Sequence, residues 1–121
     1  MLRASSQTQN LADDLDLTAV IDSTKDSGLP HGALLIAFVD AVLGKDGAAL
    51  NAARNALLKE SGPEALVDAA GVIATFMQMV RIADATGIAI DTAILEKTQE
   101  VRETLGINTF ASAQNTLGPN A

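Results

Sequence analysis

The sequence has no cysteine, tryptophan or tyrosine, and aromatic residues make up only 2% of its 121 residues. Without cysteine, the chain can form no disulfide, no thiolate metal site and no thiol nucleophile. The scarcity of aromatic residues removes the stacking surface on which single-stranded nucleic acids bind. Fifteen Asp and Glu against eight Lys and Arg give a net charge of −7. This charge disfavours DNA and anionic membrane surfaces, so we expect neither nucleic acid nor membrane as a partner.

We expect no targeting signal in residues 1–10, since a transit peptide, the less favoured alternative, would need more arginine. Residues 1–10 contain no apolar core of the type that a secretory signal requires, and we expect them to form a flexible arm. The longest strongly apolar run, Ala33–Val39, is shorter than the roughly 20 residues that cross a bilayer. We therefore expect a cytoplasmic protein.

The sequence is rich in alanine and aliphatic residues at helical spacing, and it shows no sustained alternation of the kind found in strands. This pattern predicts an all-α fold, a bundle of about five helices in one domain over 11–106. Prolines, glycines and capping residues bound the expected helices. These helices cover residues 11–27, 30–43, 46–60, 63–86 and 91–105. An irregular tail over 107–121 should follow, with Phe110 docking it onto the domain.

Three polar side chains are the expected caps of these helices. Asp46 and Asp91 stand before the third and fifth helices, where a carboxylate accepts hydrogen bonds from the first backbone N–H groups. Ser61 stands before the fourth helix, and Pro63 then occupies a first-turn position in which its missing N–H costs nothing.

The expected helix over 63–86 has only a narrow polar side when its residues are placed about 100° apart. The polar side carries Glu64, Asp68, Gly71, Thr75 and Gln78. The opposite side carries Leu66, Ala70, Ile73, Met77, Val80 and Asp84. The expected second helix is also apolar on nearly every side. Both helices should therefore be buried, either within the bundle or against another subunit, which predicts a homo-oligomer.

Asp84 is unusual because it falls within the apolar side of the expected helix, where an isolated carboxylate is expensive to bury. Arg81 lies three residues earlier, a spacing that allows contact on one helix surface. The pattern predicts an intrahelical ion pair at the edge of the core. The functional alternative is a site for an anion or a carboxylate substrate built on Arg81.

His31 is the single histidine and follows Pro30 at the start of the expected second helix. It is either a surface residue at a helix start or a general base, since histidine is the usual proton shuttle near neutral pH. Glu64 and Asp68 form an i,i+4 carboxylate pair, for which a solvated helix face is the simpler interpretation. The sequence has neither a nucleophile elbow nor a phosphate-binding loop. We expect no metal site and no cofactor.

Residues 65–88, from Ala65 to Ile88, resemble the carboxy-terminal helix of the alkylhydroperoxidase D and carboxymuconolactone decarboxylase-like superfamily. In that family such a helix ends in a pattern similar to the Arg81-Ile82-Ala83-Asp84-Ala85-Thr86-Gly87 of this chain. The preceding Leu34–Gly62 resembles the helix–loop–helix that leads into it. The resemblance implies an all-α fold and a homo-oligomer.

The catalytic cysteines of that family are absent from this chain, so the resemblance does not extend to its thiol chemistry. Peroxidase members of the family use a Cys-x-x-Cys pair with a glutamate and a histidine, and this sequence has no cysteine. A thiol peroxidase is therefore excluded, since the thiolate is the nucleophile. No catalytic residue carries over from the family to this chain, and His31 inherits no role.

Three functional hypotheses follow from the sequence. The first is a noncatalytic helical protein that assembles with itself. The second is a small-molecule enzyme with decarboxylase or lactone-type chemistry, in which Arg81 anchors a substrate carboxylate and His31 or Asp84 moves a proton. The third is an adaptor that presents a helix or a groove to another protein.

Overall fold

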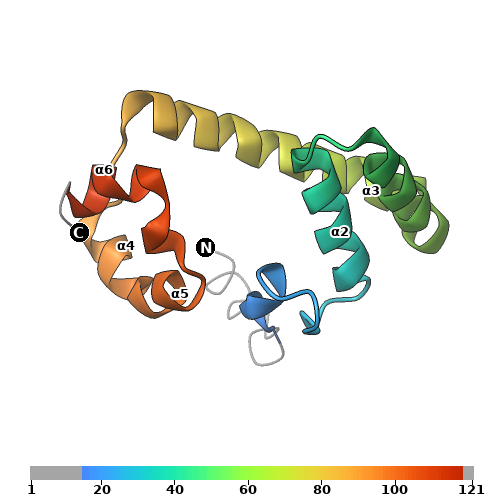
Figure 1. Ribbon diagram of the computed structural model, residues 1–121, viewed down its shortest axis with the longest axis horizontal. Helices are drawn as coiled ribbons and strands as arrows, with labels where there is room; N and C mark the ends of the chain where they lie inside the picture. Colours follow the sequence, from blue (N-terminus) through green and yellow to red (C-terminus); the bar gives the residue numbers. More distant parts are fainter. Residues whose placement is uncertain (1–14, 119–121) are drawn as a thin grey trace. The chain divides into compact units, whose positions relative to one another are not determined.

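The computed structural model describes residues 15–118, and every regular element among them is a helix or a helical turn (Figure 1). The prediction of an all-α fold is confirmed. The chain divides into two compact units, Met1–Gly71 and Val72–Ala121, and the boundary lies inside the longest helix.

The expected helix over 11–27 is wrong for the residues that the structure describes, while 11–14 and the arm 1–10 lie outside them. A single helical turn, η2 (Leu17–Val20), forms in this segment. Aspartate side chains compete with the helix because each accepts a hydrogen bond from the backbone N–H two residues later. These bonds join Thr18 N to Asp16 at 2.8 Å, Thr24 N to Asp22 at 3.0 Å and Gly28 N to Asp26 at 3.0 Å.

Helix α2 (Gly32–Leu43) begins two residues after Pro30. His31 precedes the helix in the left-handed region, with φ 57° and ψ 19°. The helix buries Gly32, Phe38 and Ala41, whereas Leu43 is 56% exposed. The expectation that α2 is buried on most sides is therefore not met within residues 15–118, and its burial against another subunit stays a prediction.

Helix α3 (Gly47–Thr86) is two helical segments joined at Gly62, which has φ 83° and ψ 172°. The segment from Pro63 to Thr86 is continuous, as the sequence predicts. Asp46 caps the first segment, since its Oδ1 accepts from Ala48 N at 2.8 Å and from Ala49 N at 3.2 Å. The expected cap at Ser61 is not formed, because its buried Oγ has no hydrogen-bond partner among the described residues.

Most apolar side chains of the segment 63–86 are exposed, and Ile73, at 8% exposure, is the buried residue of this segment. By length and composition α3 could cross a membrane: its most apolar 18-residue window has a mean hydropathy of 1.5, and 6% of that window is buried. The sequence predicts that this helix is covered by neighbouring groups. Residues 15–118 do not provide that cover.

The second unit follows α3 with α4 (Thr92–Lys97) and α5 (Gln99–Thr104), then the turns η3 (Ile107–Thr109) and η4 (Ala111–Ala113) and the short helix α6 (Gln114–Leu117). These elements gather at the carboxy-terminal end of the chain in Figure 1.

Four expectations for this unit are wrong. The expected helix over 91–105 is divided at Thr98, and Asp91 precedes α4 without a side-chain capping bond. The expected irregular tail contains the turns and α6 up to residue 117, while 119–121 lie outside the described residues. Phe110 is 63% exposed, so it does not dock the tail. Ile90 instead fixes α6, since its backbone N–H donates to Thr116 Oγ1 at 3.0 Å.

Candidate functional site

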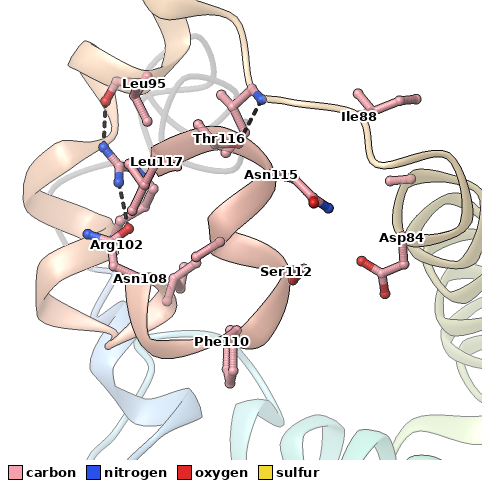
Figure 2. Close-up of a pocket in the computed structure, with 14 residues that line it drawn as sticks. Asp84, Ile88, Leu95, Arg102, Asn108, Phe110, Ser112, Asn115, Thr116 and Leu117 are labelled. Atoms are coloured by element: carbon pink, nitrogen blue, oxygen red, sulfur yellow. Dashed lines mark hydrogen bonds between the residues drawn. The ribbon is translucent and has the colours of Figure 1, made fainter. Parts of the chain in front are cut away.

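The side chain of Arg102 is the one buried charged group among the described residues, at 7% exposure. Its position in α5 places it one turn after Thr98, whose Oγ1 accepts from Arg102 Nε at 3.2 Å. Arg102 Nη1 donates to Asn108 Oδ1 at 2.6 Å, and Nη2 donates to the carbonyl oxygen of Leu95 at 2.8 Å. The guanidinium thus joins α4, α5 and η3, and every acceptor that it has here is neutral (Figure 2).

A cavity of about 160 Å³ adjoins this arginine within the second unit. Its wall is mostly apolar and is built by Ala83, Ile88, Ile90, Leu95, Ile107, Phe110, Ala113 and Leu117. Its polar groups are Asp84, Arg102, Asn108, Ser112, Asn115 and Thr116. An apolar cavity with a few convergent polar groups is the usual form of a small-molecule site.

Asp84 lines this cavity from the α3 side, as Figure 2 shows, and is exposed. The predicted ion pair with Arg81 is not formed. Within residues 15–118 the structure has one ion pair, between Lys59 and Glu60 at 3.4 Å. The burial problem that motivated that prediction does not arise, because water solvates the exposed Asp84 carboxylate. Arg81 is also exposed and is not among the residues that line the cavity.

His31 lies in the first unit and is exposed. It lines an open hollow together with Thr24, Lys25 and Asp26. The cavity of the second unit includes Asp84 but neither Arg81 nor His31. This cavity therefore does not bring Arg81 together with His31 or Asp84, the pairing that the enzymatic hypothesis requires.

Four other carboxylates of the described residues, Asp16, Asp22, Glu64 and Asp68, do not line this cavity. Glu64 and Asp68 are both exposed, which agrees with a solvated helix face. Hydrogen bonds from the Thr18 hydroxyl and then from its backbone N–H lower the pKa of Asp16. The same two bonds from Thr24 lower the pKa of Asp22. Among the residues described, no three His, Asp or Glu side chains group as a metal site would require.

The sequence analysis missed Arg102, although a signal for it exists. Leu95, Thr98, Arg102 and Leu105 recur at helical spacing in the segment expected to be the fifth helix, and Leu95 and Leu105 are among its apolar residues. An arginine on the apolar side of a helix is the same anomaly that drew attention to Asp84. Asn108 gave no signal, because it lies in the segment expected to be irregular.

Comparison with known proteins finds no matching family model, no matching curated protein and no matching solved structure. The resemblance to the alkylhydroperoxidase D-like superfamily therefore stays a prediction.

Proposed function

We propose that this chain is a noncatalytic, cytoplasmic helical protein that associates with copies of itself through α3. In this proposal it is a relative of the alkylhydroperoxidase D-like superfamily that keeps the helical packing without the thiol chemistry. The absence of cysteine supports the second part of the proposal, since no thiolate is available for peroxide reduction.

One observation carries the proposal of self-association: α3 exposes a stripe of large apolar side chains. Val72 is 56% exposed, Phe76 55%, Met79 51% and Val80 54%. These residues recur at i, i+4, i+7 and i+8, so they share one helix face, and we call them the α3 stripe. Soluble proteins rarely leave such a continuous apolar face in water. An exposed apolar face of this kind typically marks an interface with another protein chain.

A second copy of the chain suits the α3 stripe better than a lipid bilayer does. The apolar part of α3 contains Asp68, Gln78 and Arg81. Charged side chains within a membrane-spanning segment are unfavourable and rare, and this segment carries two of them. In a helix pair, the same polar side chains stay at the solvated edges while the stripe is buried. The acidic net charge of −7 also opposes binding to anionic lipid.

Sedimentation equilibrium of the full-length chain at micromolar concentration tests the proposal. We expect a dimer or a larger assembly for the natural sequence and a shift towards monomer for Phe76→Glu, which places a charge in the α3 stripe. Gln78→Glu adds the same charge at an exposed position of the polar side and should leave the assembly unchanged. A monomeric natural chain, or its recovery only with membranes, would contradict the proposal.

The enzymatic hypothesis needs Arg81 to converge with His31 or Asp84 on one pocket, and the described residues do not support that arrangement. The cavity that contains Asp84 includes neither of the other two. The adaptor hypothesis becomes an outcome of the same experiment. A monomeric chain that binds another helical protein through the α3 stripe would favour it.

A further inference from the structure

The charge of Arg102 is buried without a counterion in the described part of the chain. Its side chain is 7% exposed, and its three acceptors are a hydroxyl, an amide oxygen and a backbone carbonyl. No carboxylate between residues 15 and 118 forms an ion pair with it. Removing a cation from water is expensive unless an opposite charge compensates for it. Within residues 15–118 the buried charge of Arg102 is therefore not compensated.

The guanidinium also retains hydrogen-bonding capacity. Arginine carries five N–H donors in a planar fork that matches the two oxygens of a carboxylate. Three of these donors are used, one each on Nε, Nη1 and Nη2. The remaining N–H groups on Nη1 and Nη2 have no acceptor among residues 15–118. They are the donors available to a bound anion.

The cavity beside Arg102 sets the size and polarity of that anion. A cavity of about 150 Å³ lined by aliphatic and aromatic side chains holds benzene. The cavity here has a similar volume of about 160 Å³, is partly open to solvent, and is walled by Ile88, Ile90, Leu95 and other apolar residues. It therefore suits a hydrocarbon group of about the size of a benzene ring. A phosphate or sulfate would leave this apolar wall unfilled.

Asp84 restricts the ligand further. It lies on the α3 side of the same cavity, where Ser112 and Asn115 are the neighbouring polar residues (Figure 2). Its negative charge repels a second anionic group on the ligand. The cavity thus offers one cation for one carboxylate and disfavours a dicarboxylate.

We propose that this cavity binds a small monocarboxylate whose oxygens accept hydrogen bonds from Arg102 and whose hydrocarbon group fills the apolar wall. Binding would place a negative charge beside Arg102, which has no ion-pair partner among residues 15–118. This inference is independent of the proposed self-association, because the cavity lies within the second unit of one chain and none of the α3 stripe residues lines it.

Titration of the full-length, ¹⁵N-labelled chain with benzoate, followed by NMR, tests the inference. We expect saturable shifts of the backbone amides of Ile90, Asn108 and Leu117, which line the cavity. Benzamide has the same ring without the charge and should bind about tenfold more weakly or worse, since charge-assisted hydrogen bonds are much the stronger ones. Equal shifts with benzoate and benzamide, or no saturable shift with benzoate, would overturn the proposal.

Terephthalate, which adds a second carboxylate at the far side of the ring, tests the role of Asp84. It should bind several-fold more weakly than benzoate, and Asp84→Asn should reduce that difference by removing the repulsion. A preference for terephthalate in the natural chain would overturn the assignment of one carboxylate to the site.

Two variants locate the site without removing Arg102, whose loss would also break three structural hydrogen bonds. Ala113→Leu fills the cavity and should abolish benzoate binding, whereas Ala111→Leu adds the same bulk at an exposed neighbouring position outside the lining. Asn108→Asp places a carboxylate against Arg102 Nη1 and should weaken benzoate binding by about tenfold or more. Benzoate binding that is equal in Ala113→Leu and Ala111→Leu would place the ligand elsewhere and refute the proposal.

Discussion

Arg102 Nη1 donates to Asn108 Oδ1 at 2.6 Å, and this bond holds the turn η3 against α5. Loss of the amide leaves a buried guanidinium donor without its acceptor. Asn108→Ala should therefore lower the free energy of unfolding by about 1–3 kcal/mol. Urea unfolding measures the loss, with Asn115→Ala at an exposed position as the matched control. An equal effect of both substitutions would show that the Asn108 bond contributes nothing specific.

Gly62 separates the two segments of α3 in a conformation, φ 83° and ψ 172°, that is essentially restricted to glycine. A Cβ at this position meets no atom within 4 Å, so the effect of Gly62→Ala is backbone strain rather than a clash. We expect a loss of about 1–3 kcal/mol in thermal unfolding.

Gly71 is the matched control, because it is helical and its Cβ would also meet no atom within 4 Å. Gly71→Ala should stabilise the chain by up to about 1 kcal/mol. If both substitutions stabilise the chain, the break at Gly62 does not exist in solution.

Asp46 should contribute measurably to the first segment of α3, since its Oδ1 accepts from both Ala48 and Ala49. Asp46→Ala should cost about 1 kcal/mol, whereas Asp46→Asn keeps an acceptor oxygen and should cost only a few tenths. Chemical unfolding monitored by circular dichroism compares the two variants. The exposed pair Lys59–Glu60 is a useful contrast, because Lys59→Ala should change stability by less than about 1 kcal/mol.

The stability of the loop around η2 should depend on pH in the acid range. Hydrogen bonds from Thr18 and Thr24 hold the pKa values of Asp16 and Asp22 below their ordinary value of 3.8. Their stabilising contribution is complete above the unfolded value of 3.8 and is lost as the pH falls through the lower folded values.

Amide exchange at Thr18 and Thr24 should therefore accelerate below this range in the natural chain. Asp16→Asn and Asp22→Asn keep an acceptor oxygen but do not ionise. Each should therefore remove the acid-dependent increase in amide exchange at its own turn. Persistence of the full pH dependence in the double variant would mean that other groups cause it.

The strongest sequence predictions concern features that a single helix determines. The continuous segment 63–86 follows from its dense apolar residues between Pro63 and Gly87, and the cap at Asp46 follows from local geometry. The expected helix 11–27 fails for an equally local reason. Asp16, Asp22 and Asp26 bind their own backbone, which apolar spacing alone does not reveal.

The candidate site was beyond sequence reasoning because it depends on how short turns pack together. Arg102 meets Leu95 and Thr98 by helical spacing, but Asn108 reaches it only because the chain turns back at Gly106, which has φ 67°. The expectation that Asp84 would pair with Arg81 assumed a buried helix face. Both residues are exposed among the described residues, so water can solvate each charge and no ion pair is required.

A spin-label measurement tests most directly whether a second copy covers the α3 stripe. The chain has no cysteine, so the substitution Gln78→Cys gives one nitroxide label at an exposed position of α3. Pulsed dipolar spectroscopy should then detect coupling between the labels of two chains, which an excess of unlabelled chain reduces and Phe76→Glu eliminates. The absence of coupling at micromolar concentration, or coupling that Phe76→Glu leaves unchanged, would contradict the account.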